Sequence, residues 1–193
     1  MVVGLTGHSG SGKTTVAGIF SGLGFYHVDC DKLVHEHVYT DREVHRALAD
    51  KFGDGVIKDG SVDRRVLASI IFSDESKYAC LMQTITPFIR KAVLEAIRVH
   101  GEMVLVDAPA LFEYGLEGAC DVTLSVISDD ALSRIISRDG ITEEEAKARL
   151  SHQKSHEFYI KNSDYVIKNN GSLSQLELQT KQIYEQIMKG VAV

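Results

Sequence analysis

The stretch that most constrains this chain lies at residues 7–14. Its letters, GHSGSGKT, fit G-x-x-x-x-G-K-[ST], a pattern in which a glycine-rich loop surrounds a phosphate group. A short apolar run at residues 2–5 precedes the loop, and apolar residues with helical spacing follow it over residues 14–20. The sequence therefore predicts a buried strand, a phosphate-binding loop and a helix whose N-terminus adds partial positive charge.

The residue types within this loop indicate how a nucleoside triphosphate would bind. Glycines allow the tight turn that points successive backbone amides at one anion. Lys13 has the reach to contact the β- and γ-phosphates, and the hydroxyl of Thr14 is suited to ligate Mg²⁺. The predicted contacts to the nucleotide from this stretch are Ser9, Gly10, Ser11, Gly12, Lys13, Thr14 and Thr15.

Length and charge narrow the class of protein. The 193 residues predict one compact α/β domain with small excursions, and a net charge of −6 argues against binding to nucleic acid. No apolar run is as long as a membrane span, and an N-terminus that enters a strand directly predicts no secretory leader. Three cysteines far apart in the sequence predict free thiols in a reducing cytoplasm. We expect small-molecule partners, no membrane contact, and a monomer or weak homo-oligomer.

Acidic residues follow two of the predicted strands. Residues 25–28 read as a strand that ends at Asp29 and Asp31, and residues 103–107 as one that ends at Asp107. Ligands bind at the carboxyl ends of strands in parallel sheets, and acids two apart on an extended segment face the same side. Asp31 either accepts a proton from a substrate hydroxyl or caps a helix that begins near residue 32. Asp107 fits a carboxylate that faces the Mg²⁺ shell.

The next segment, residues 32–100, is predicted to be mostly helical. Arg64 and Arg65 begin a helix over residues 63–72, where positive charge is unfavourable against the helix dipole. The two arginines therefore indicate either an anionic ligand or a solvated basic turn. Pro87 is predicted to lie in the first turn of the following helix.

The last part of the chain predicts further strands and a helical flap. Residues 122–127 and 165–167 read as strands, and Asp129 or Asp130 is expected to cap a helix that runs to about Arg138. Strand-then-helix order implies a parallel sheet. Thr142 and Glu145 form a capping box, and the surrounding arginines suit a lid over phosphates or a salt-linked surface helix. Asn169 and Asn170 either touch a nucleotide base or only form a turn.

These segments, taken in order, resemble the dephospho-coenzyme A kinase family over nearly the whole chain. The matching stretches are the phosphate loop, Asp29 with Asp31, residues 59–67 (D-G-x-x-x-R-R-x-L), residues 107–113 (D-x-P-L-L-x-E, with Ala110 for a usual Leu), residues 138–146, and residues 164–171. The sequence departs from the family at His8 and Ser9, where Gly and Ile are frequent, and lacks the usual arginine between Gln153 and Asp164.

The resemblance implies ATP-dependent phosphorylation of the ribose 3′-hydroxyl of dephospho-coenzyme A, with Mg²⁺. It implies that Asp31 is the general base, that Lys13 and Arg138 contact the transferring phosphoryl group, and that Asn170 contributes to the nucleotide site. The implied acceptor-binding residues are Asp29, Asp31, Arg65, Leu111 and Glu113.

The expected fold is a P-loop three-layer α/β sandwich with a mainly parallel five-stranded sheet. The core would comprise residues 1–31, 101–137 and 155–193, with a helical acceptor-binding region at 32–100 and a helical lid at 138–154. Three other functions stay open at this stage: a nucleoside monophosphate or other small-metabolite kinase, a GTP-dependent switch, and a non-catalytic nucleotide sensor. The switch is disfavoured because residues 161–164 read KNSD rather than N-K-x-D.

Overall fold

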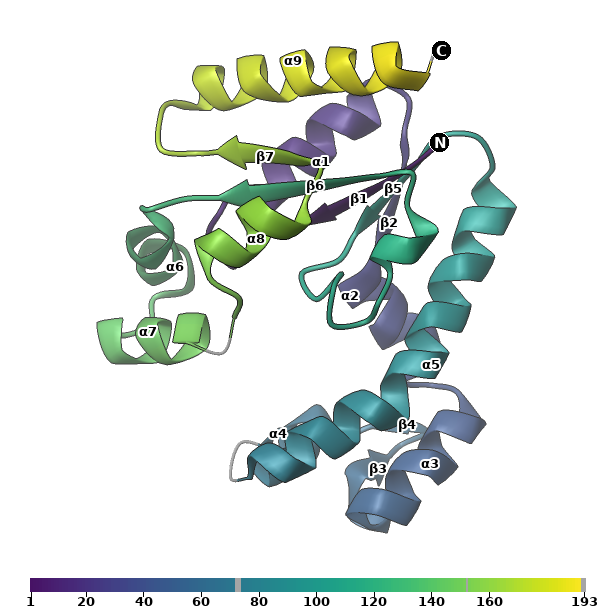
Figure 1. Ribbon diagram of the computed structural model, residues 1–193. Coiled ribbons are helices and arrows are strands. Elements are labelled where there is room, and N and C mark those ends of the chain that lie inside the picture. The colour runs from purple at the N-terminus through teal and green to yellow at the C-terminus, as the bar shows by residue number, and fades with distance from the viewer. Residues whose placement is uncertain (72–73, 152, 192–193) are drawn as a thin grey trace. The chain divides into compact units, whose positions relative to one another are not determined.

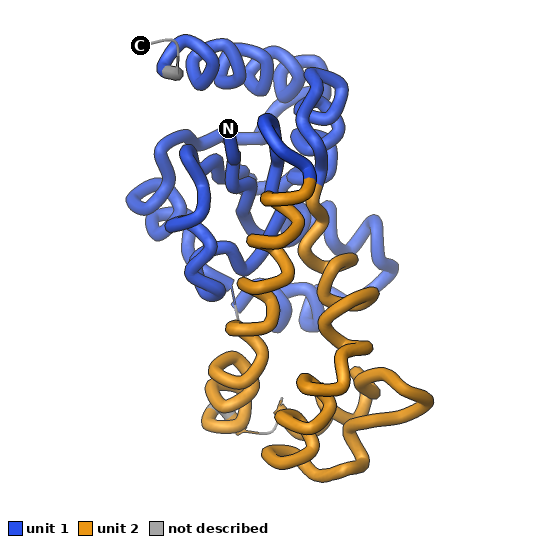
Figure 2. Tube along the Cα trace, turned by 90° about the vertical axis from the view of Figure 1, so that its right-hand side faces the viewer, with its two compact units in different colours: residues 1–27, 100–193 blue, residues 28–99 orange. Residues whose placement is uncertain are grey.

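The computed structural model describes residues 1–71, 74–151 and 153–191. It divides into two compact units, one of residues 1–27 with 100–193 and one of residues 28–99 (Figure 2). Phe72, at the end of a predicted helix, and His152, inside the predicted lid, lie outside these ranges. Among the described residues, no helix combines the length and apolar character needed to cross a membrane.

A five-stranded sheet carries the fold. Its order is β2-β5-β1-β6-β7, with β1 parallel to both β5 and β6, and β6 parallel to β7. The strands are β1 (Val2–Thr6), β2 (Tyr26–Asp29), β5 (Val104–Asp107), β6 (Val122–Ile127) and β7 (Tyr165–Lys168). The predicted mainly parallel five-stranded sheet is confirmed.

Helices cover both faces of this sheet. In Figure 1, α8 lies in front of the strands and α1 behind them. The helices of this unit are α1 (Lys13–Gly22), η3 (Glu117–Ala119), α6 (Ala131–Asp139), α7 (Glu143–Ser151), α8 (His156–Asn162) and α9 (Leu173–Val191). Phe20 of α1 is fully buried, with its ring centroid 5.2 Å from Phe25 and 6.1 Å from Tyr184. Strand residues such as Leu5 and Leu105 are fully buried because both faces of the sheet are covered.

The second unit is mostly helical, as the sequence predicts. Its elements are α2 (Cys30–Leu33), the π-helix η1 (Val34–Val38), α3 (Arg42–Phe52), the 3₁₀ turn η2 (Asp54–Val56), the antiparallel β3 (Ile57–Lys58) and β4 (Ser61–Val62), α4 (Arg64–Ile71) and α5 (Glu75–His100). Val44 and Leu48, one helical turn apart on α3, are fully buried.

Pro87 lies inside α5, so its predicted place in the first turn of a helix is wrong. Proline removes one backbone hydrogen bond and crowds the preceding turn. The helix nevertheless continues, because Ile85, Ile89 and Val93 keep one buried face across the proline. Figure 1 shows α5 bending along its length, as expected for a helix with an interior proline.

Asp31 lies in the first turn of α2 rather than on an extended segment. The expectation that Asp29 and Asp31 face the same side of a strand is therefore wrong. Asp29 is the N-cap of α2, and its carboxylate accepts a hydrogen bond from the Lys32 amide at 3.0 Å. The capping role that the sequence left open for Asp31 belongs to Asp29, because the helix begins two residues earlier than expected.

Candidate active site

The glycine-rich loop connects the end of β1 to the start of α1. Gly12 is the N-cap of α1 with φ of 101°, and Gly7 has φ of 134°. A Cβ on Gly7 would lie 2.1 Å from the carbonyl oxygen of Val126, and a Cβ on Gly12 would lie 2.4 Å from Nδ2 of Asn169. Both positions require glycine because the backbone conformation and the close neighbours leave no room for a side chain.

Lys13 folds over this loop from the first turn of α1. Its ammonium group donates to the carbonyl oxygens of Gly7 at 2.7 Å and His8 at 3.2 Å. Asn169 supports the loop from the other side, since its Nδ2 donates to the carbonyl oxygen of Ser11 at 2.8 Å. The loop is thereby fixed between its own lysine and the end of β7, with the N-terminus of α1 directed at the enclosed space.

Asp107 ends β5, and its Oδ1 is buried with no hydrogen-bond partner among the residues that the structure describes. Its other oxygen lies 3.4 Å from Nε2 of His27. A buried carboxylate oxygen without a donor is costly unless a cation binds it. Thr14, the other predicted ligand, is solvent-exposed in the first turn of α1. Carboxylate and hydroxyl oxygens suit Mg²⁺, so these residues fit the ion.

Arg138 of α6 lies beside the loop, and Arg149 of α7 shares its acidic partner Asp139. Nη2 of Arg138, at the end of α6, lies 3.5 Å from Oγ of Ser9. Arg138 also donates two hydrogen bonds to Asp139, at 2.6 and 2.9 Å, and Arg149 of α7 donates a third at 2.5 Å. Hydrogen bonds from these two arginines lower the pKa of Asp139 to about 2, so its carboxylate is ionised at neutral pH.

The turn between α6 and α7 has the predicted form. Gly140 ends α6 with φ of 65°, and the capping box is confirmed. The Glu145 amide donates to Oγ1 of Thr142 at 3.2 Å, and the Thr142 amide donates to the Glu145 carboxylate at 2.8 Å. Asp130 is the N-cap of α6, but its side chain accepts no capping hydrogen bond and instead lies 3.5 Å from Arg134.

Two contacts to the loop come from Gln153 and His156, residues that carried no distinct sequence signal. The amide of Ser9 donates to Oε1 of Gln153 at 2.9 Å, and His8 contacts His156 of α8. Asn170 pairs with Asp129, accepting from its amide at 2.9 Å and donating to its carboxylate at 2.5 Å. From the sequence alone, polar residues that follow a helix are expected to lie at the surface. Only the three-dimensional structure shows that these residues lie close to the loop.

The residues predicted to bind the acceptor substrate lie in different structural environments. Leu111 is fully buried, and Glu113 is partly exposed in the turn that follows β5. Arg65 lies in the first turn of α4, where Asp63 accepts hydrogen bonds from the amides of Arg65 at 3.0 Å and Val66 at 3.2 Å. Asp63 therefore caps α4 and offsets the arginines at its N-terminus.

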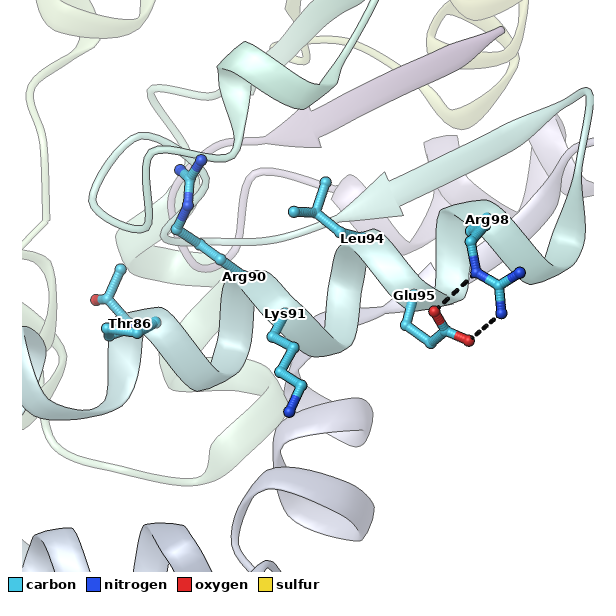
Figure 3. Close-up of a pocket in the computed structure, with 7 residues that line it drawn as sticks. Thr86, Arg90, Lys91, Leu94, Glu95 and Arg98 are labelled. Atoms are coloured by element: carbon cyan, nitrogen blue, oxygen red, sulfur yellow. Dashed lines mark hydrogen bonds and ion pairs between the residues drawn. The ribbon is translucent and has the colours of Figure 1, made fainter.

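The second unit also has a cavity of about 770 Å³ along α5 (Figure 3). Its lining includes Arg90, Lys91 and Leu94, and Glu95 is paired with Arg98 at 2.6 Å. Basic groups around an apolar floor suit a ligand with an anionic end and an apolar body. The sequence pattern did not single out this helix face, because its residues read as an ordinary amphipathic stripe.

The parallel sheet, the glycine-rich loop after β1 and the arginine beside that loop define a P-loop kinase. The chain belongs to the dephospho-CoA kinase family, because the family model described as Dephospho-CoA kinase matches residues 1–175.

Relatives and solved structures agree with this assignment. A dephospho-CoA kinase from Bacillus licheniformis is 36% identical over 192 residues, which cover 96% of each chain. A crystal structure from Thermus thermophilus superposes with a TM-score of 0.79 at 32% identity, covering 96% of this chain and 97% of that one. A dephospho-CoA kinase structure from Campylobacter jejuni gives a TM-score of 0.71 at 26% identity and covers 98% of both chains.

Proposed function

We propose that this protein transfers the γ-phosphoryl group of ATP to the ribose 3′-hydroxyl of dephospho-coenzyme A, giving coenzyme A and ADP. The observation that carries the proposal is the family match over residues 1–175, which includes the complete phosphate-binding loop. Family membership indicates the reaction, and the loop with Lys13 supplies the groups that a triphosphate needs.

In this reaction the protein contributes placement and charge. The amides of the loop and the ammonium group of Lys13 bind the β- and γ-phosphates, with Asn170 on the nucleotide side. Arg138 leaves Asp139 to contact the transferring phosphoryl group. Asp31 accepts the proton of the attacking hydroxyl. The Arg138 position is supported by the 3.5 Å separation between its Nη2 and Oγ of Ser9.

Mg²⁺ is part of the proposal, with Thr14 and Asp107 as the residues that hold it. The ion would neutralise charge on the β- and γ-phosphates when it is bound. The unpartnered Oδ1 of Asp107 supports this assignment, because the oxygen is buried without a donor in the part of the chain that the structure describes.

The proposal divides the chain by task. Residues 1–31, 101–137 and 155–193 form the nucleotide-binding core, residues 138–154 form the lid, and residues 32–100 bind the acceptor through Arg65 and its neighbours, with Glu113 as a further contact. We place the reaction in the cytoplasm, a compartment consistent with three cysteines that form no disulfide.

A coupled ADP-release assay tests the function. The acceptors are dephospho-coenzyme A, AMP and CMP at equal concentration, and the donors are ATP and GTP. We expect ADP release that requires dephospho-coenzyme A, with a product one phosphate heavier at its 3′ position by mass spectrometry and ³¹P NMR. Equal turnover with AMP or CMP would instead favour a nucleoside monophosphate kinase, and binding without turnover would favour a nucleotide sensor.

A further inference from the structure

His8 is a buried titratable side chain inside the phosphate-binding loop, and the mechanism above gives it no task. Its exposed fraction is 4%, and its Nε2 lies 2.6 Å from Nε2 of His156, the first residue of α8. The two imidazole planes are within 15° of each other. The ring of Tyr159 lies 6.3 Å away, centroid to centroid. Two histidines this close share one hydrogen, since two bare nitrogens or two N–H groups would repel.

The hydrogen-bond partners determine where that hydrogen is. Nδ1 of His8 lies 3.1 Å from the carbonyl oxygen of Ser9, which only accepts, so Nδ1 carries a hydrogen. Nε2 of a neutral His8 is then an acceptor, which agrees with the Ser128 amide that donates to it at 3.4 Å. The hydrogen between the rings therefore belongs to His156. Nδ1 of His156 faces the Asp129 carboxylate at 3.5 Å. We call His8, His156 and Asp129 the histidine clasp.

The clasp joins the loop to the segment that leaves the lid. Gln153 accepts from the amide of Ser9 at 2.9 Å, and His156 donates to His8, so this segment contacts two successive loop residues. A cavity of about 330 Å³ borders the contact and is lined in part by Leu132 and Leu150. The hydrogen bond between the two histidines is thus one of two side-chain contacts, with that of Gln153, that hold the loop to the lid exit.

We propose that His8 and His156 are positioning residues for phosphoryl transfer, which hold the phosphate-binding loop to the lid exit through one shared hydrogen and release it in acid. The proposal rests on the function proposed above. When His156 carries hydrogens on both ring nitrogens, one toward His8 and one toward Asp129, a hydrogen added to Nε2 of His8 would face an N–H at 2.6 Å, so the rings must separate.

The groups around His8 determine the pH at which the two rings separate. Burial lowers the pKa of His8 below the ordinary 6.5, and the positive charges of His156 and Lys13 lower it further. The Ser9 carbonyl and the Asp129 carboxylate act in the opposite direction and raise this pKa. His8 is thus neutral above pH 6.5, and the clasp opens as the pH falls through the lowered pKa. The other titratable or charged groups near the pair are Tyr159, whose pKa burial raises to about 12, and Glu157, Lys154 and Arg138.

Substitutions at His156 test the role of this hydrogen bond separately from any effect on the stability of the fold. Glutamine can donate to a neutral His8 or accept from a protonated one, so His156→Gln keeps the contact at every pH. Phenylalanine keeps a ring without a donor, so His156→Phe loses the contact. Lys161→Gln, on the exposed side of the same helix, is the matched control. The quantity measured is kcat/KM for ATP between pH 5 and 8.5, since this ratio follows titrations of the free enzyme.

The clasp predicts a specific pattern among these variants. His156→Phe should lower kcat/KM for ATP about fivefold at pH 8, the effect of one lost hydrogen bond, with KM for dephospho-coenzyme A unchanged. His156→Gln should match the wild type at pH 8 and lose the part of the acid limb that comes from His8. Lys161→Gln should keep the wild-type profile. Identical profiles in all four proteins, or an equal loss at every pH in both histidine variants, would overturn the proposal.

A second measurement tests the clasp without the reaction. ¹⁵N NMR of the wild-type histidine rings at pH 7.5 should show His8 with hydrogen on Nδ1 and none on Nε2. Hydrogen on Nε2 of His8 would exclude the clasp, whatever the kinetics. If the wild type fails to phosphorylate dephospho-coenzyme A, the proposed function is wrong, and the positioning role for that reaction is wrong with it. A normal reaction with unchanged variants removes only the positioning role.

Discussion

Replacing Gly7 by alanine should destabilise the whole nucleotide-binding unit. The backbone at Gly7 has φ of 134°, a conformation that costs a side-chain-bearing residue about 1–3 kcal/mol. The added Cβ would lie 2.1 Å from the carbonyl oxygen of Val126, although real Cβ contacts are essentially never under 3.0 Å. That oxygen belongs to β6, whose backbone is hydrogen-bonded to β1 and β7 and cannot turn aside. Relieving the overlap costs about another 1–3 kcal/mol.

The two costs give a loss of about 2–6 kcal/mol, which lowers the melting temperature of a chain this size by roughly 4–24 °C. Gly18→Ala is the matched control, because Gly18 is exposed within α1 and a Cβ there would have nothing within 4 Å. Alanine is the better helix former, so this change should stabilise by about 0.5–1 kcal/mol. Thermal and urea unfolding followed by circular dichroism measure both. A Gly7→Ala protein as stable as the wild type would refute the steric argument.

Three further outcomes are expected. Arg138→Ala should lower kcat by about 10³-fold, as loss of a phosphate-contacting arginine does, whereas Lys189→Ala on α9 should not; near-normal turnover would remove Arg138 from the mechanism. Asp31→Asn should keep ATP affinity, measured calorimetrically, but lose about 10²- to 10⁴-fold in kcat, and an unchanged rate would show that no base is needed there. Burial raises the pKa of Cys120 to about 12, so a disulfide reagent at pH 8 should label it far more slowly than Cys80, and equal rates would contradict that burial.

The sheet and the loop could be predicted because their signals are local. The apolar runs that became β5 and β6, and the glycine pattern before Lys13, depend on neighbours a few residues away. The capping box at Thr142 is local in the same way. Such patterns specify a backbone conformation independently of contacts with distant parts of the chain.

The errors and omissions come from contacts between distant segments. The continuation of α5 through Pro87 depends on a buried face that local propensity does not report. Asn169 lies 158 residues from Ser11 in the chain, and His156 lies 148 from His8, yet both pairs are hydrogen-bonded. Asparagine in a turn and histidine at a helix start have ordinary local explanations, so sequence spacing could not reveal the shared contact with the loop.

The arrangement at Asp139 has a consequence for how nucleotides are selected. One carboxylate accepts hydrogen bonds from both Arg138 and Arg149, so in the proposed reaction a phosphate would recruit Arg138 by exchanging one anionic partner for another. The free energy gained is then the difference between the contact of Arg138 with phosphate and its contact with Asp139. It is smaller than the full free energy of one charge-assisted hydrogen bond. In the proposed reaction a singly charged anion would gain little from such an exchange and the tail of a triphosphate would gain more, so the proposed lid would discriminate by charge density.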